Sequence, residues 1–129
     1  MADELVLIVE DNEKNRKLVR DVLRYNKYRT VETASAEEGL RLALEQRPDL
    51  ILMDFQLPGM NGIEALARLR ARPETRAIPV IAVTASAMTE EHQQIVAAGF
   101  DAMQTKPIRV REFMQVVRDT LARRKGRPE

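Results

Sequence analysis

The stretch PDLILMDFQLPGMNG, residues 48–62, joins a short apolar run, one carboxylate and a dense turn signal. The apolar residues Leu50 to Met53, and then Phe55, flank Asp54, and the proline, asparagine and two glycines that follow are typical of a turn. A carboxylate at the end of a buried strand costs free energy unless a partner neutralises it or a reaction uses it. The stretch therefore predicts a buried strand that ends at Asp54 and opens onto a loop, and Asp54 needs polar partners from elsewhere in the chain.

The composition bounds the class of protein. The chain has 129 residues, 44% of them hydrophobic and 32% charged, with a net charge of +1 and no cysteine. These values predict one soluble, cytoplasmic domain without disulfides, and no preference for nucleic acid or membrane. No apolar run approaches the ~20 residues of a membrane-spanning helix. We expect one domain over residues 1–123 and a basic C-terminal tail over residues 124–129.

Five β-prone runs alternate with five segments of helical periodicity. The expected strands cover residues 5–9, 30–34, 50–54, 78–84 and 101–105, and the expected helices begin near residues 13, 36, 62, 89 and 110. Strands that alternate with single helices predict a parallel α/β sheet covered on both faces. Of the topologies with right-handed crossovers, a doubly wound, flavodoxin-like five-stranded sheet in the order 2-1-3-4-5 suits this length. A closed (β/α) barrel is excluded because it needs about 250 residues.

The helix ends and helix faces give finer predictions. Asn12 is expected to cap the first helix, Ser35 with Glu38 to form a capping box for the second, and Thr89 to cap the fourth. The fourth helix carries few large apolar residues, chiefly Ile95 and Val96, so we expect it to be loosely anchored. The last helix has the clearest apolar stripe, at Val110, Phe113, Met114, Val117 and Leu121.

Polar residues converge at one edge of the predicted sheet. All strands of a parallel sheet end along the same edge, and ligands bind there where the strand order reverses. The residues that this places together are Glu10, Asp11, Asp54, Thr84 and Lys106. Carboxylates 4 Å apart repel one another by about 4 kcal/mol per pair at an effective dielectric near 20, so a proton or a cation must lie among them. Oxygen ligands favour Mg²⁺ over zinc.

The same edge has the groups needed for phosphoryl chemistry. With Mg²⁺ bound, Asp54 can attack phosphorus and form an acyl phosphate. The Lys106 ammonium and the Thr84 hydroxyl are available to the phosphoryl oxygens, and the backbone N–H groups that follow Asp54 and Thr84 add further donors.

Four segments carry a resemblance to a known family: residues 9–12 (VEDN), 52–62 (LMDFQLPGMNG), 83–85 (VTA) and 106–107 (KP). In this order and at these separations, the sequence resembles a response-regulator receiver domain of two-component signalling across nearly the whole chain. The run of residues 11–15, taken with residues 54–58, is similar to single-domain regulators of the DivK type and to the receivers of hybrid kinases.

The resemblance implies a role for each site residue. Asp54 would accept a phosphoryl group from the phosphohistidine of a histidine kinase or histidine phosphotransfer protein. Asp11 would hold Mg²⁺ directly and Glu10 mainly through water, while Asp54 and the backbone carbonyl of Gln56 would complete the protein ligands. The phosphoryl oxygens would be bound by Thr84, Ala85, Lys106 and the Gln56 backbone.

The resemblance also implies how the signal leaves the site. Thr84 and Met103 occupy the switch positions, and Pro107 would follow a cis peptide bond. Met103 stands where the family usually has Tyr or Phe, and it has neither a ring nor a hydroxyl. The output would be a protein surface around the fourth helix, the fifth strand and the fifth helix, which binds an effector protein and allows a homodimer. No DNA-binding output fits in the chain, and the only reactions that it would catalyse are its own phosphorylation and dephosphorylation.

Two other functions compete with this interpretation. A small-molecule phosphatase or phosphotransferase can also use an aspartyl phosphate, but such enzymes favour a second acid two residues after the nucleophile, where this chain has Gln56. A constitutive scaffold that needs no phosphate is the other candidate, and the complete set of acids with Thr84 and Lys106 argues against it.

Overall fold

Strands and helices alternate along the whole of the described chain. The structure is a computed structural model and describes residues 3–125. Its elements are, in order, β1 (Leu5–Val9), α1 (Glu13–Tyr25), β2 (Arg29–Thr33), α2 (Ala36–Gln46), β3 (Leu50–Asp54), α3 (Gly62–Arg70), β4 (Val80–Thr84), α4 (Thr89–Ala98), β5 (Ala102–Thr105) and α5 (Val110–Lys125). All strand pairs are parallel and the order is β2-β1-β3-β4-β5, which confirms the predicted doubly wound sheet.

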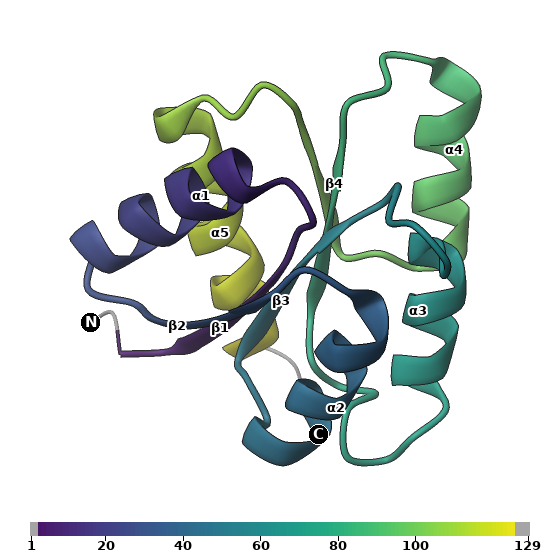
Figure 1. The fold of residues 1–129 in the computed structure, drawn as a ribbon, viewed down its shortest axis with the longest axis horizontal. Helices are drawn as coiled ribbons and strands as arrows, with labels where there is room; N and C mark the ends of the chain where they lie inside the picture. Colours follow the sequence, from purple (N-terminus) through teal and green to yellow (C-terminus); the bar gives the residue numbers. More distant parts are fainter. Residues whose placement is uncertain (1–2, 126–129) are drawn as a thin grey trace.

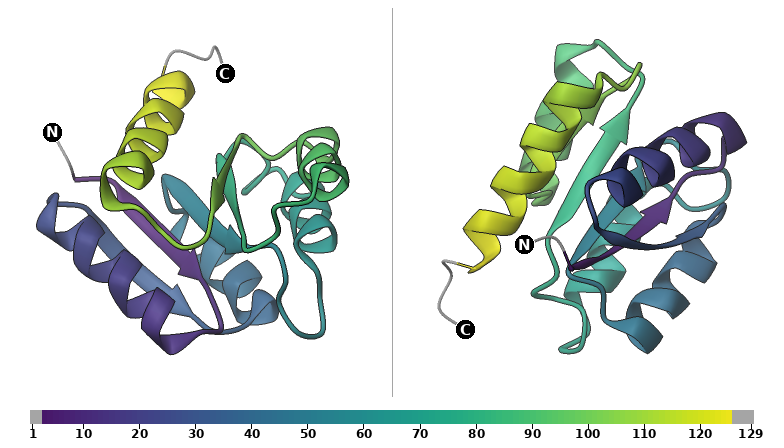
Figure 2. Two further views of the ribbon diagram at one scale, coloured as in Figure 1. Left: turned by 90° about the horizontal axis from the view of Figure 1, so that it is seen from above. Right: turned by 90° about the vertical axis from the view of Figure 1, so that its left-hand side faces the viewer.

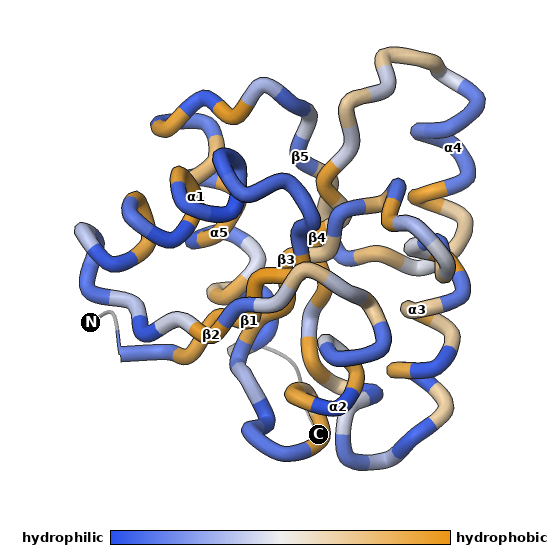
Figure 3. Tube along the Cα trace, viewed as in Figure 1, coloured by the Kyte–Doolittle hydropathy of each residue, from blue (hydrophilic) through white to orange (hydrophobic). Residues whose placement is uncertain are grey.

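The sheet forms the middle layer of three (Figures 1 and 2). Helices α1 and α5 cover one face, and α2, α3 and α4 cover the other. The central strands β1, β3 and β4 are apolar up to their last residues, which are Asp54 in β3 and Thr84 in β4, and they appear as orange segments at the centre of Figure 3. Alternate residues point to opposite faces. In β1, for example, Val6 and Ile8 pack with α1 and α5, while Leu7 and Val9 pack with α2 and α3.

The caps of the first two helices agree with the sequence. The Asn12 side chain accepts a hydrogen bond from the Asn15 N–H at 3.0 Å, and Ser35 accepts one from the Glu38 N–H at 3.2 Å. Only half of the capping box forms, because the Glu38 carboxylate accepts a hydrogen bond from the Thr33 hydroxyl instead of reaching back to Ser35.

The cap predicted for α4 is wrong. Thr89 is the first helical residue, and the N-cap is Met88, whose side chain makes no capping hydrogen bond. Ser86 closes the preceding turn by accepting a hydrogen bond from the Met88 N–H, so the polar residue that ends the loop lies three positions earlier than expected.

The helix faces explain how firmly each helix is held. The predicted stripe of α5 is buried except for Val110 in its first turn, which is 47% exposed. In α4 only Ile95 is buried, and Val96 is 72% exposed, so this helix buries even fewer apolar side chains than the sequence indicated.

Helix α5 extends beyond the predicted domain boundary. It continues to Lys125, and Arg124 within it forms an ion pair with Asp49 at 3.1 Å. The tail expected over residues 124–129 therefore begins inside this helix, and residues 126–129 lie outside the described residues. Between residues 3 and 125, no helix combines the length and the apolar character needed to cross a membrane.

Candidate functional site

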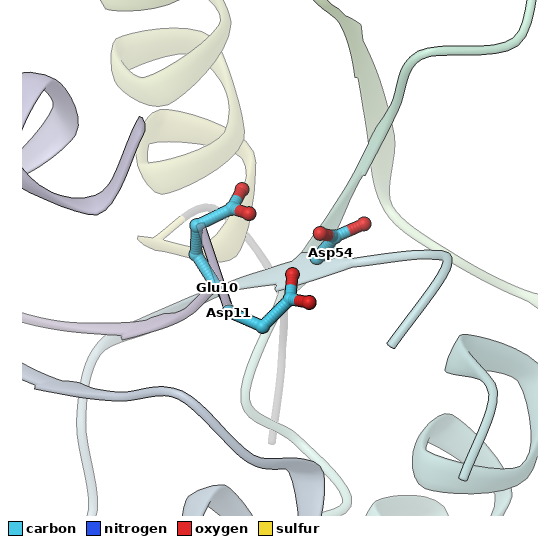
Figure 4. Close-up of side chains that lie close together, drawn as sticks. All are labelled: Glu10, Asp11 and Asp54. Carbon is cyan, nitrogen blue, oxygen red and sulfur yellow. The ribbon is translucent and has the colours of Figure 1, made fainter. Parts of the chain in front are cut away.

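Three carboxylates meet where β1 and β3 end. Glu10 and Asp11 follow β1 directly, Asp54 is the last residue of β3, and these two strands are neighbours in the sheet. Each acid offers an oxygen within 4.8 Å of the others, and Figure 4 shows the three side chains directed toward a common space. Glu10 and Asp54 are buried, whereas Asp11 is exposed, so the cluster has two fixed members and one that faces solvent.

The Lys106 ammonium bridges the two buried acids. Its Nζ lies 3.0 Å from Glu10 Oε1 and 3.2 Å from Asp54 Oδ2. The lysine is brought there by the parallel pairing of β4 and β5, because its backbone N–H donates to the carbonyl of Thr84 at 2.8 Å just beyond the paired strands. The Lys106–Pro107 peptide bond is cis, as predicted.

Burial and neighbouring charges both affect the pKa values of Glu10 and Lys106. Burial raises the pKa of Glu10; the N–H of Asn12 opposes that shift, and nearby Asp54 adds to it. Burial alone would lower the pKa of Lys106, but the hydrogen bond to Glu10 and the charge of Asp54 outweigh it, so its pKa is raised. One firmly charged ammonium therefore faces three carboxylates, and the excess negative charge is suited to a cation.

Backbone donors fix the orientation of the two buried acids. The Gln56 N–H donates to Asp54 Oδ1 at 3.0 Å, and the Asn12 N–H donates to Glu10 Oε2 at 3.1 Å. Asp54 is thus held through one oxygen by the chain that follows it and through the other by Lys106. Such fixed carboxylates are preorganised for a ligand or a reaction at this edge of the sheet.

The other predicted site residues lie around this cluster in different settings. Thr84 is fully buried at the end of β4, and its hydroxyl donates to Glu91 on α4 at 2.6 Å. Ala85 and the Gln56 side chain are exposed next to it. Met103 is half-buried on β5 and packs against the core on the α2–α3 face. The phosphate-binding and switch roles of these residues remain predictions.

Sequence reasoning missed Arg16, which supports the acid cluster from α1. Its Nη1 donates to the backbone carbonyl of Glu10 at 2.9 Å, and its Nε pairs with Glu32 on β2 at 3.0 Å. Arg20 pairs with the same glutamate at 2.9 Å. The only signal in the sequence is that Arg16 falls in the first turn of a helix that begins just after the two acids.

Sequence reasoning also missed Glu91. In the sequence it is only an acid in the first turn of a helix, a position that favours the helix dipole. In the structure its carboxylate accepts hydrogen bonds from Thr84 and, at 3.4 Å, from the Gln56 side chain. No spacing rule predicts this contact, because it depends on how α4 lies over the ends of β3 and β4.

The donor set fits Mg²⁺ on chemical grounds. All the candidate ligand atoms are oxygens, two of the acids are buried and oriented, and the third faces solvent where water can complete the coordination shell. Zinc sites usually contain nitrogen or sulfur ligands, which this group lacks.

Comparisons with known proteins agree with this geometry. Residues 6–118 match the family model of the response regulator receiver domain. The chain is 47% identical over 116 residues to the polar-differentiation response regulator DivK of Brucella anthropi, which covers 90% of this chain and 94% of that protein.

Solved structures show the same architecture. The receiver domain of a sensor histidine kinase from Pseudomonas aeruginosa, which has a magnesium ion coordinated in its active site cleft, aligns with a TM-score of 0.86 and 32% identity over 94% of this chain and 99% of that one. The chemotaxis protein CheY4 of Vibrio cholerae aligns with a TM-score of 0.86 and 25% identity over 92% of this chain and 99% of that one.

Proposed function

This chain belongs to the response regulator receiver domain family, and from that premise we propose that Asp54 is the phosphoacceptor of a Mg²⁺-dependent switch. One observation carries the assignment to this residue. Asp54 is the buried acid that ends β3, it contacts the Lys106 ammonium at 3.2 Å, and it offers an oxygen within 4.8 Å of the other two carboxylates. A buried carboxylate with this excess of negative charge around it favours a bound cation.

The proposed reaction is a direct transfer between side chains. An oxygen of Asp54 attacks the phosphorus of a phosphohistidine, the phosphorus–nitrogen bond breaks, and its electron pair stays on the imidazole nitrogen of the donor. Lys106, which bridges Glu10 and Asp54 before transfer, would then form an ion pair with a phosphoryl oxygen. The backbone N–H groups of Gln56 and Ala85 and the Thr84 hydroxyl would bind the remaining oxygens.

The metal ligands in this proposal are Asp11, Asp54 and the backbone carbonyl of Gln56, with Glu10 acting mainly through water. The ion supplies positive charge that offsets the mutual repulsion of the carboxylates and the incoming phosphoryl group. The magnesium ion in the receiver domain from Pseudomonas aeruginosa supports the choice of metal.

The proposed partners follow from this chemistry. The phosphoryl donor is a histidine kinase or histidine phosphotransfer protein, and the output is an effector protein that binds the surface of α4, β5 and α5, where a homodimer can also form. We propose a cytoplasmic location because ATP, the source of the phosphoryl group, is found there. The domain has no other substrate in this proposal and catalyses only its own phosphorylation and dephosphorylation.

Labelling with a small phosphoryl donor tests the assignment. Incubation with acetyl phosphate and Mg²⁺ should add one phosphoryl group to the wild-type protein, detected by intact mass spectrometry, and the label should be lost with hydroxylamine. Asp54→Asn should abolish labelling, because it replaces the carboxylate that attacks phosphorus by a neutral amide, which is a poor nucleophile. Asp119→Asn, an exposed acid on α5, is the matched control and should label normally. Stable label on Asp54→Asn would refute the assignment.

A further inference from the structure

The Thr84 hydroxyl is already engaged before any phosphoryl group arrives. It donates to Glu91 Oε1 at 2.6 Å, and its oxygen accepts a hydrogen bond from the Ser86 N–H at 3.1 Å. A hydroxyl has a single hydrogen to donate, so while Thr84 binds Glu91 it cannot donate to a second acceptor. A hydroxyl-to-carboxylate bond of this length is charge-assisted and roughly twice as strong as a neutral hydrogen bond.

Glu91 reaches both chain segments that border the acceptor. Its second carboxylate oxygen accepts a longer hydrogen bond, 3.4 Å, from the side chain of Gln56. The backbone N–H of Gln56 holds Asp54, and Asp54 pairs in the sheet with Val83, the residue before Thr84. A single carboxylate on α4 is thus connected to the loop after β3 and to the last residue of β4.

Helix α4 depends on this connection more than the other helices depend on theirs. It buries only Ile95, and its N-cap residue Met88 provides no side-chain hydrogen bond. The side-chain contacts that hold its first turn are the Thr84–Glu91 bond, the longer Gln56–Glu91 bond and a contact of 2.8 Å between His92 Nε2 and the Ser86 carbonyl. Loss of the Thr84 bond would therefore free one of the few attachments of this helix.

We propose that Glu91 is a positioning residue that holds Thr84 in the resting protein and competes with the phosphoryl group for the hydrogen of its hydroxyl. The inference rests on the proposed function of Asp54. When Asp54 is phosphorylated, the Thr84 hydroxyl turns its hydrogen bond from Glu91 to a phosphoryl oxygen, and no covalent bond changes in this step. Glu91 is then left without its shortest contact, and the first turn of α4 is released.

Beryllofluoride with Mg²⁺ is a suitable probe, because it mimics the phosphoryl group without hydrolysis. Its affinity for the full chain can be measured by titration in ¹H–¹⁵N NMR spectra, which also show whether each variant is folded. Glu91→Ala should bind beryllofluoride about tenfold more tightly than the wild type, since one hydrogen bond to a charged group no longer competes. Glu91→Gln keeps the length but not the charge and should show a smaller gain.

Glu90 provides the matched control. It precedes Glu91 in the same helical turn, carries the same charge and is exposed, and its side chain makes no hydrogen bond or ion pair with the described part of the chain. Glu90→Ala should leave the affinity within about twofold of wild type, as expected for an exposed charge screened by solvent. A gain as large as that of Glu91→Ala would overturn the proposal.

A double-mutant cycle with Thr84→Val separates the hydrogen bond from general repulsion. Valine has nearly the shape of threonine but no hydroxyl, so Glu91→Ala should give no further gain in this background. If the full gain persists there, Glu91 acts only through its charge and the competition for the hydroxyl is refuted. If the wild type fails to bind beryllofluoride at all, the proposed function itself fails; if it binds but Glu91→Ala does not change the affinity, only this inference fails.

Discussion

The two edges of the sheet carry aspartates in opposite situations. At the edge where the strands begin, Asp49 accepts hydrogen bonds from the Leu5 N–H at 2.8 Å and pairs with Arg124 at 3.1 Å. Asp101 there accepts from the Val80 N–H at 2.8 Å and pairs with Arg70 at 2.9 Å. Each of these acids has an arginine and a backbone N–H of its own.

At the edge where the strands end, three clustered acids have one lysine beside them, and it contacts two of them. Glu10 and Asp54 each accept one backbone N–H and both contact Lys106, while Asp11 forms no hydrogen bond or ion pair within residues 3–125. The same residue type therefore stabilises one edge and leaves the other short of positive charge. Local energetic conflicts of this kind are expected at functional sites, where a ligand provides what the fold does not.

The largest expected effect on the free energy of unfolding is at Asp101. Asp101→Ala removes a carboxylate that is only 9% exposed, and the Val80 N–H and the Arg70 guanidinium both lose this acceptor. The free energy of unfolding should fall by about 3 kcal/mol, in the range found for buried pairs that lose one member. Urea denaturation monitored by circular dichroism measures it. A loss below about 1 kcal/mol would show that Asp101 is no more than a surface acid.

The corresponding change at the other edge should have the opposite sign. Asp54→Asn removes one charge from a group of three acids, and Lys106 keeps its contact with Glu10. Without Mg²⁺, the free energy of unfolding should rise by about 1 kcal/mol, because the relieved repulsion exceeds the lost ion pair. Added Mg²⁺ should stabilise the wild type and have much less effect on the variant, as thermal unfolding with and without the ion can show. If Asp54→Asn is destabilising, the two edges do not differ in the way proposed.

The edge where the strands end was predictable because each residue there ends a strand or comes just after one. Glu10, Asp54 and Thr84 are placed by strand register alone, so the parallel topology brings them together whatever the helices do. Arg16 and Glu91 were missed because they reach the site from helices. Their contacts depend on side-chain length and on how each helix lies over the sheet, which periodicity does not report.

The α4 region shows a second limit of sequence reasoning. Its few apolar residues correctly predicted weak anchoring, but Thr89 satisfied the usual preference for an N-cap and still lies inside the helix. The turn closed by Ser86 and the bond between Thr84 and Glu91 fix where α4 begins, and both are set by the end of β4. Tertiary contacts therefore override the local capping signal at this position.

The smallest expected effect is a pH dependence that belongs to the site alone. The pKa of Glu10 is raised above its ordinary value of 4.5, first by burial and then by Asp54, so the folded state binds this proton more tightly than the unfolded state. Between the ordinary and the raised pKa, the metal-free protein should therefore become more stable as the pH falls, until Asp21, whose pKa is lowered by its hydrogen bond from Lys17, becomes protonated. Mg²⁺ should abolish the gain, because it favours the ionised acid, and Glu10→Gln should lack it altogether. Urea midpoints measured across this pH range with a chelator present would reveal the trend. A midpoint that only decreases as the pH is lowered would mean that Lys106 neutralises Glu10 fully. This edge of the sheet would then be as well satisfied as the other.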